Sequence, residues 1–378
     1  MLFPSLHKEM NEKAPLYYVL SSIEGFGKVT TRKLLEKVGS VKRLFTEAES
    51  LNELSPAIRR KLLEARENPP LWEEANRVLS LAEEEGISII TIEDPNYPML
   101  LKECADAPLI LYLKGNIEQL QQPHMLSVVG TRNASSYGRF AVTKLLEGLA
   151  QKVPDLVVVS GLALGIDITA HRSALELGLG TIAVMAYGHH FVYPYEHRKE
   201  AEQIVQKGIM LSEYPPDTPV ERHRFVARNR IVAGLSLGTV VIESAQKGGA
   251  LLTASMATDY NREVFALPGR ITDKYSAGCN KMISSSQALA FTSEKEIIEA
   301  LGWQNTPSTL QQTTLASSQP LPEDPVLQLI AKEESMLFDE LLLKSDLRAS
   351  DLSSKLFDLE LEGYIESLPG GRYTLAFR

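Results

Sequence analysis

The sequence predicts an α/β protein in which a Rossmann-like parallel sheet forms the core, a helical unit precedes it and a small winged-helix-like unit follows. The chain has 378 residues, and since one hydrophobic core usually stops growing near roughly 250 residues, we expect more than one folding unit. Its middle contains short β-branched runs separated by helical stretches, which is typical of βαβ units. The expected units are 1–85, 86–304 and 326–378, with a linker at 305–325.

The segment from Leu20 to Phe45 predicts two helices joined by a tight hairpin. Apolar residues recur at helical spacing on both sides of Gly25-Phe26-Gly27. The arrangement resembles the helix-hairpin-helix motif of small SAM-like domains, in which backbone N–H groups at the start of the second helix contact a phosphate. It fits equally a hairpin used only for packing. More helix is expected up to about Glu85.

From Gly86 to about Trp303 the chain predicts strands that are buried on both faces of a sheet. Near-continuous apolar runs, rather than alternating ones, are typical of parallel strands covered by helices on both sides. The helical stretches between the runs would supply these covering helices. The expected strands are 87–92, 109–113, 126–130, 156–161, 181–188, 239–244 and 264–269.

The last part of the chain predicts a linker and a winged-helix-like fold. The stretch Thr306–Pro325 is rich in Ser, Thr, Gln and Pro and contains no Lys or Arg. After it, Leu352, Leu356 and Leu359 share one helical face, and two strand-like runs flank the turn at 369–371.

The charge of the candidate recognition helix in this last unit argues against DNA contact. Its acidic residues are Asp351, Asp358, Glu360 and Glu362, against one lysine, Lys355. Such a surface would repel phosphates. We therefore expect this unit to dock a protein or to have a purely structural role.

Composition excludes several classes of protein. No apolar stretch approaches the ~18 residues of a membrane span, and the first residues do not form a signal peptide, so we expect a cytoplasmic protein without membrane association. Cys104 and Cys279 have no metal-ligand spacing, so we expect buried thiols and no metal site. The net charge of −9 means that any nucleic-acid contact must come from a local basic patch.

Ligands of open parallel sheets bind beyond the carboxyl ends of the strands, and Val128–Gly138 contains one such strand-to-helix turn. Gly130 frees the backbone there. Arg132 occupies the place of the second glycine of a dinucleotide-binding fingerprint, where its side chain would obstruct a pyrophosphate. Its forked donors suit an exposed phosphate instead, so we expect no NAD or other cofactor.

A second turn, Val157–His171, places Ser160 and Gly161 where they could line an anion-binding nest. Asp167 and His171 are four residues apart and could form an acid-base or metal pair. No third ligand is apparent, and we favour a helix-start carboxylate and a polar packing histidine.

A third segment, Ala186–Arg198, begins with a glycine loop at Gly188 and interleaves aromatic residues with His and Arg. Aromatic rings beside cations suit single-stranded nucleic acid, because bases stack on the rings while cations hold the backbone. Tyr193 is the stacking candidate. The alternative is that this ring packs under a loop.

A fourth segment, Arg222–Ser236, concentrates arginines in a short helical stretch of an acidic protein. The polar residues concerned are Arg222, Arg224, Arg228, Asn229 and Arg230. Guanidinium groups suit phosphate contact, whereas a merely solvated face would be served equally well by lysine. The following segment, Glu243–Ala254, offers another glycine-opened helix start with Lys247 beside it.

No nucleophile elbow, Walker loop, zinc-protease motif or paired CxxC occurs in the sequence. We therefore expect a binding protein rather than an enzyme.

In this order, the segments closely resemble the bacterial DNA-processing protein A family, also called DprA or Smf. The resemblance covers about Gly86 to Phe291. The matching segments are DPNYPMLL, APLILYLKG, VVGTRNASSYG, SGLALGIDITAH, YP after a glycine loop, ARNRIVAGLS, ESAQKGGALLTA, ALPG and SAGCNKMI.

The resemblance implies a homodimer that binds single-stranded DNA without strong sequence preference and hands it to the RecA recombinase during natural transformation. The candidate DNA-binding residues are Gly130, Arg132, Ser135, Ser160, Gly161, Gly188, Tyr193, Arg228, Asn229, Arg230 and Lys247.

Two other functions compete with this one. The chain is also similar to lysine-decarboxylase-like phosphoribohydrolases, which would make Glu243 catalytic and the arginines a 5′-phosphate site, although the PGG that precedes GT in that family is missing. A scaffold with protein-binding terminal units and an inert core is the third possibility.

Overall fold

The computed structural model describes residues 13–303, 324–331, 336–345, 347–361, 364–368 and 372–375. These residues belong to two compact units, Met1–Ser308 and Thr309–Arg378. The predicted linker at 305–325, apart from its last two residues, and the turn at 369–371 lie outside the described residues.

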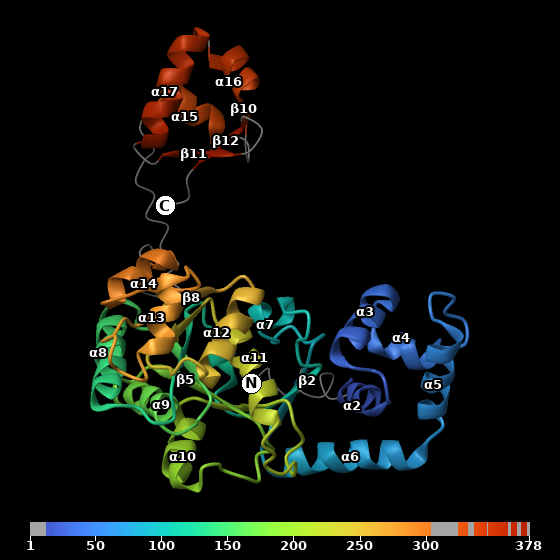
Figure 1. Ribbon diagram of the computed structural model, residues 1–378. Coiled ribbons are helices and arrows are strands. Elements are labelled where there is room, and N and C mark those ends of the chain that lie inside the picture. Colours follow the sequence, from blue (N-terminus) through green and yellow to red (C-terminus); the bar gives the residue numbers. More distant parts are fainter. Residues whose placement is uncertain are drawn as a thin grey trace. The chain divides into compact units, whose positions relative to one another are not determined.

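A nine-stranded sheet forms the centre of the first unit (Figure 1). Its strands are β1 (Ser88–Thr91), β2 (Ile110–Gly115), β3 (Met125–Val129), β4 (Val157–Ser160), β5 (Gly180–Met185), β6 (Ile209–Ser212), β7 (Gly238–Val241), β8 (Glu263–Ala266) and β9 (Leu289–Ala290). They lie in the order β1-β2-β6-β5-β4-β3-β7-β8-β9. All neighbours from β6 to β9 are parallel, which confirms the predicted α/β class.

The sheet differs from the predicted one at β1 and β2, which pair antiparallel with each other, as does β2 with β6. The connection between β1 and β2 contains one short helix, α7 (Met99–Glu103), in place of the long covering helix that is usual in a parallel crossover. Strands β6 and β9 were not predicted. In the sequence β6 contains only three consecutive apolar residues, Ile209–Leu211, and β9 has only two residues, so neither stands out as an apolar run.

Successive residues of β3 face opposite sides of the sheet, and each side is covered by helices. Leu126 and Val128 share a hydrophobic cluster with α8 (Ser136–Lys152), α9 (Ile166–Glu176) and α14 (Glu294–Ala300). Met125 and Val129 belong to another cluster with α11 (Arg224–Leu235), α12 (Gly249–Asp259) and α13 (Ala277–Ser284). Next to α9, α10 (Arg198–Lys207) covers β5, after the short 3₁₀ turn η2 (Tyr195–His197). These helices form both outer layers of the sheet (Figure 1).

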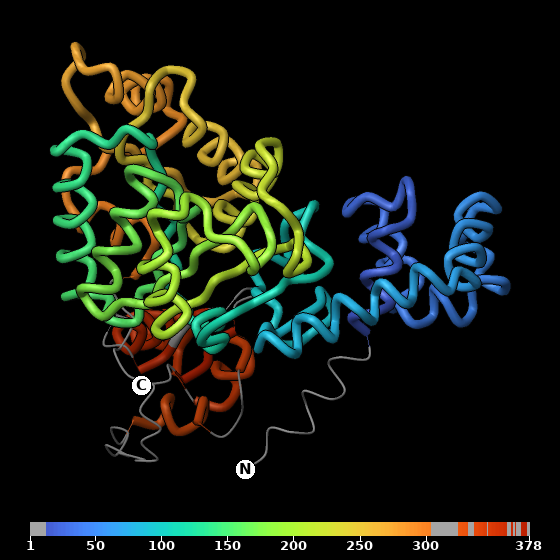
Figure 2. Tube along the Cα trace, turned by 90° about the horizontal axis from the view of Figure 1, so that it is seen from below, coloured from blue at the N-terminus to red at the C-terminus, as the bar shows by residue number. Residues whose placement is uncertain are grey.

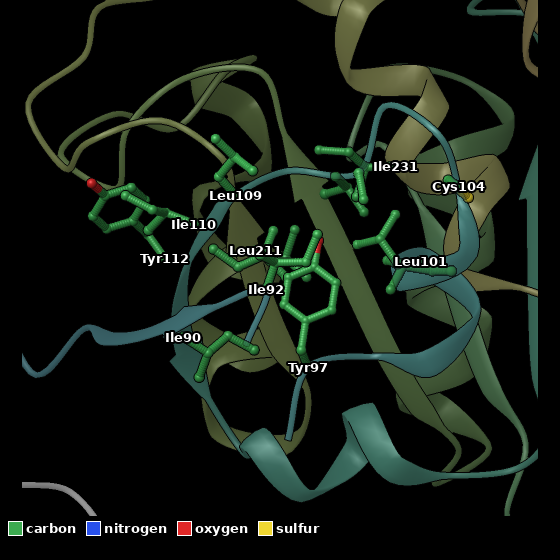
Figure 3. Close-up of a cluster of buried hydrophobic side chains, with 14 of the residues drawn as sticks. Ile90, Ile92, Tyr97, Leu101, Cys104, Leu109, Ile110, Tyr112, Leu211 and Ile231 are labelled. Carbon is green, nitrogen blue, oxygen red and sulfur yellow. The ribbon is translucent and has the colours of Figure 1, made fainter. Parts of the chain in front are cut away.

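The N-terminal helices share a core with one edge of the sheet. They are α2 (Ala14–Ser22), α3 (Lys28–Val38), α4 (Val41–Thr46), α5 (Pro56–Arg66) and α6 (Pro69–Glu84), shown in blue beside β2 in Figures 1 and 2. The predicted pair of helices around Gly25-Phe26-Gly27 is α2 and α3. Tyr17 and Leu20 are buried in the same hydrophobic cluster as Ile90 and Leu111 of β1 and β2. Figure 3 shows Ile90 with further members of that cluster, among them Tyr97, Leu101 and Ile231 of α11.

Both cysteines are free and buried, as predicted. Burial raises the pKa of the Cys279 thiol to about 12, so this thiol stays protonated. Among the described residues, no helix combines the length and the apolar character needed to cross a bilayer.

The second unit has the predicted winged-helix character. Its elements are α15 (Pro325–Ile330), β10 (Met336–Leu337), α16 (Phe338–Ser345), α17 (Ala349–Leu361), β11 (Ile365–Leu368) and β12 (Arg372–Leu375). The strands form an antiparallel sheet in the order β10-β12-β11. Leu352, Leu356 and Leu359 are buried on one side of α17, as their spacing predicts.

Candidate nucleic-acid interface

A cleft of about 270 Å³ opens at the point where the order of the parallel strands reverses. From β3 the chain continues through β4 to β6 on one side, and through β7 to β9 on the other. Ligands of open α/β sheets bind at such a switch point, beyond the carboxyl ends of the strands. The cleft is lined from four segments, within 129–132, 161–167, 225–232 and 244–253.

The turn after β3 needs glycine at position 130. A Cβ atom there would lie 2.5 Å from the side chain of Ile166 and 3.1 Å from the carbonyl oxygen of Glu243. The next residue is fixed as well, because Thr131 N–H donates to the Glu243 carbonyl at 2.7 Å. Together these contacts hold the turn between α9 and the end of β7, so that Arg132 is presented at the cleft.

Arg132 is exposed and lies next to the ring of Phe225, which in turn contacts a second ring. Its guanidinium carbon is 5.7 Å from the centroid of the Phe225 ring. Phe225 in turn meets Tyr193 edge-on at 5.6 Å, and Tyr193 is 48% exposed. Arg132 forms no ion pair with any residue that the structure describes. A cation and two rings thus form one accessible surface, with the properties that stacking bases and phosphates require.

Arg228 lines the cleft from below and is itself buried. Its guanidinium donates to the carbonyl oxygens of Gly161, at 2.8 Å, and Val184. Gly161 is required because a Cβ there would come within 2.5 Å of Arg228 Nη2. Burial raises the pKa of the neighbouring Asp167 carboxyl, while Arg228 acts in the opposite direction.

Asp167 and His171 do not form an acid-base pair. Asp167 accepts a hydrogen bond from Gly161 N–H at 3.2 Å, whereas His171 Nδ1 bonds the Thr181 hydroxyl at 2.7 Å. Burial lowers the pKa of His171 to about 3. The favoured interpretation of His171 as a polar packing residue therefore agrees with its surroundings.

Several of the candidate residues lie outside the cleft. Arg230 is buried and pairs with Glu213 at 2.6 Å and Asp106 at 3.6 Å. The Ser160 hydroxyl donates to the Val128 carbonyl at 2.6 Å, between two strands. A Cβ on Gly188 would lie 2.1 Å from the Pro215 carbonyl oxygen. This glycine therefore permits the loop after β5 and the loop after β6 to lie close to each other.

Ser135 and Glu243 together fix the start of α8. Ser135 caps the helix by accepting a hydrogen bond from Gly138 N–H at 3.0 Å. Its own N–H and hydroxyl donate to the Glu243 carboxylate at 2.9 and 2.5 Å. Glu243 is only 5% exposed and has both oxygens engaged, so its geometry is that of a structural anchor.

Lys247 is exposed in the turn before α12, between cleft-lining residues Ala245 and Gly248. It makes no ion pair within the described ranges. Asn229 also lines the cleft, and its side-chain oxygen accepts from Arg228 Nε at 3.3 Å. Of the candidate residues, Gly130, Arg132, Gly161, Arg228 and Asn229 line the cleft directly.

Sequence reasoning missed Phe225 as a site residue. It lies inside the arginine-rich segment RHRFVARNR, and its position between Arg224 and Arg228 was the available signal. Only the fold places this ring between Arg132 and Tyr193, which come from two other loops.

Comparisons with known proteins give a consistent result. Residues 88–302 match the family model described as DNA recombination-mediator protein A, and residues 311–371 match the model of the DprA winged helix domain. The chain is 39% identical over 229 residues to the DNA processing protein DprA of Bacillus subtilis, covering 61% of this chain and 76% of that protein. It is 34% identical over 317 residues to Protein Smf of Synechocystis, covering 75% and 79% of the two chains. These matches confirm the resemblance found in the sequence.

Solved structures agree. DNA processing protein A from Streptococcus pneumoniae superposes with a TM-score of 0.58 at 33% identity, over 72% of this chain and 97% of that one. DNA processing protein A from Helicobacter pylori superposes with a TM-score of 0.51 at 30% identity, over 57% and 96%. The structure of the Helicobacter protein is described as giving insight into its single-stranded DNA binding mode.

Proposed function

The chain belongs to the DNA recombination-mediator protein A family, and on this premise we propose that it binds single-stranded DNA in the cleft at the β3–β7 switch point. The observation that carries this proposal is the exposed surface made by Arg132, Phe225 and Tyr193. The single-stranded DNA binding mode described for the Helicobacter pylori relative supports the same class of ligand.

The proposed contacts divide by chemistry. Arg132 and Lys247 would hold phosphates, since both are exposed cations without an ion pair among the described residues. Phe225 and Tyr193 would stack bases, a contact that tolerates any sequence because every base has a π-face. Arg228 would contact the DNA from the floor of the cleft. This local arrangement would overcome the net charge of −9 by placing cations where the polyanion lies.

The remaining candidates would support the cleft rather than touch DNA. Ser135, Ser160, Gly188 and Arg230 each have a contact that shapes the strands, loops or helices around it. In this proposal they are positioning residues.

We further propose that the protein forms a homodimer and delivers DNA to the RecA recombinase in the cytoplasm during natural transformation. The descriptions of the relatives as DNA-processing proteins and of the family as recombination mediators support this role. It requires binding and release of DNA, and no bond of the DNA is broken, so we propose a protein without catalytic activity. The phosphoribohydrolase alternative is not favoured, because Glu243 is buried and held by Ser135.

Titration of labelled oligo-dT by fluorescence anisotropy tests the proposed function. We expect Arg132→Ala to weaken binding and to flatten the salt dependence by up to about 0.7 per lost phosphate contact. Its thermal stability should stay close to that of the wild type because the side chain is exposed. Arg228→Ala should weaken binding and also lower stability, since two buried carbonyls lose their donor.

The matched control is Lys207→Ala, which removes one exposed cation at the far end of α10 and should bind as the wild type does. Duplex DNA and RNA of the same length show whether the preference is for single-stranded DNA. Equal affinity and salt slope for Arg132→Ala and the wild type would contradict the proposal.

A further inference from the structure

A second cavity, of about 870 Å³, lies beside the cleft. It is lined by the start of α8, by Glu243 and by the loop 268–275. The cleft itself is lined by Ser244, the next residue in the chain. The cleft and the second cavity therefore lie on either side of the backbone that follows β7. An extended ligand could pass from one to the other.

The loop that walls this cavity is anchored at both ends and exposed between them. Asn280 accepts from Gly269 N–H at 3.1 Å and donates to the Gly269 carbonyl at 2.9 Å. At the other end, Ser244 N–H donates to the Tyr275 carbonyl at 2.6 Å. The residues between are exposed, and Ile271 reaches 94% exposure. The loop is thus held in place against the switch point, with its middle directed into solvent.

The loop carries two cations, Arg270 and Lys274, against one carboxylate, Asp273. Neither cation forms an ion pair with any residue in the described part of the chain. Lys274 Nζ is 5.5 Å from the centroid of the Tyr275 ring. This cation and ring repeat the chemistry of Arg132 and Phe225 on the other side of the turn.

A direct contact connects the two sides. Asn133, the residue after Arg132, donates from Nδ2 to the Tyr275 hydroxyl at 3.2 Å. A further ring, Tyr137 at the start of α8, lines the same cavity and is 53% exposed. Cations and rings therefore lie on both sides of the turn after β7, and Asn133 and Tyr275 are in contact across it.

We propose that this cavity is a second nucleotide subsite on the same path of single-stranded DNA. Arg270 and Lys274 hold phosphates at the rim, and a base enters between Tyr137 and Tyr275. The Glu243 carboxylate in the wall repels phosphate from the interior, so the backbone of the DNA follows the rim and the base points inward. This inference rests on the proposed function and adds a site to it.

Oligonucleotide length separates the two sites experimentally. With oligo-dT of about 4 to about 16 nucleotides, wild-type affinity should increase with length as the second subsite fills. In Arg270→Ala/Lys274→Ala the increase should stop at a shorter length, while the shortest oligomer binds as before. The salt slope for long oligomers should flatten by up to about 1.4, or about 0.7 for each contact. Tyr137→Ala should weaken long oligomers by at least about fivefold, the lower limit for one stacked base.

The control is Lys102→Ala/Lys207→Ala, which makes the same change of charge at exposed residues that line neither hollow. If the wild type bound no oligomer of any length, the proposed function itself would fail. If the wild type bound but Arg270→Ala/Lys274→Ala matched this control at every length, the second subsite would be overturned and the cleft would stand. Thermal unfolding of each variant confirms that the fold is intact.

Discussion

At the scale of single residues, the surroundings of a polar side chain decide what it can do. Arg228 and Arg230 are two residues apart on α11, and since each residue turns a helix by about 100°, their side chains leave it on opposite sides. Arg228 lines the cleft and donates hydrogen bonds to the backbone carbonyls of Gly161 and Val184. Arg230 forms ion pairs with Glu213 and Asp106. Two neighbouring arginines of one motif thus have different partners.

His171 predicts a dependence of stability on pH. Burial lowers its pKa to about 3 from an ordinary 6.5, and burial lowers that of His189 to about 4. Between about pH 6.5 and the folded pKa, only the unfolded chain binds the proton, so stability is complete above this range and falls as the pH falls. We expect a limiting slope of about 1.4 kcal/mol per pH unit for each group, measured by urea unfolding.

His171→Met removes one of the two titrating groups. The slope of the unfolding free energy against pH should therefore decrease by up to about 1.4 kcal/mol per pH unit. An unchanged slope in His171→Met would show that His171 takes up its proton equally in both states.

At the scale of the elements, the start of α8 depends on a carboxylate from another strand. The Glu243 side chain, just after β7, accepts both donors of Ser135 at the positive end of the 17-residue helix. This contact connects the turn after β3 with the turn after β7. The two edges of the cleft are therefore positioned by the same residue.

Replacing Glu243 tests this role. In Glu243→Gln one acceptor oxygen becomes an amide donor, so we expect a loss of about 0.5 to 2 kcal/mol in the free energy of unfolding, the range for helix caps. Glu263→Gln, at an exposed position of β8, should have no such effect. The phosphoribohydrolase alternative makes the opposite prediction: the wild type would release base from nucleoside monophosphates and Glu243→Gln would lose that activity at unchanged stability.

At the scale of the whole molecule, the N-terminal helices and the sheet form one folding unit. Tyr17 and Leu20 lie in the cluster that contains β1 and β2. Polar contacts reinforce the junction, since Lys28 pairs with Glu213 and Arg77 with Asp217. The predicted boundary at residue 85 therefore separates two kinds of structure that share a core.

Truncation tests whether the parts of the chain on either side of residue 85 and of residue 308 fold independently. A chain that ends at residue 308 should unfold at the temperature of the first unit in the full chain, because the division into compact units lies there. A chain that starts at residue 86 exposes the side of β1 and β2 that packs on α2. Since each buried large apolar side chain contributes about 1.5 to 3 kcal/mol, we expect a loss of more than about 3 kcal/mol and binding of a hydrophobic dye. Calorimetry of both chains would contradict this view if the second were as stable as the first.

The sequence by itself determined the class of the protein and the location of its turns. Apolar runs such as Val157–Ser160 and glycines such as Gly130 are local signals, because burial on both faces and close backbone approach restrict the residue type wherever they occur. The same local signals were sufficient to find the segments that line the cleft, and to predict the helix and the two longer strands of the winged unit.

Only the tertiary structure decided which side chains face the cleft, and the reason is that this depends on residues far apart in the chain. Arg132, Tyr193 and Phe225 become neighbours because they follow β3, follow β5 and begin α11, three places that the fold brings together at one edge of the sheet. Glu243 was a catalytic candidate in the sequence, but in the structure its carboxylate is held by Ser135, 108 residues earlier. Strand β6 likewise could not be found from the sequence, because only three consecutive apolar residues mark it, while its hydrogen-bond partners lie in β2 and β5.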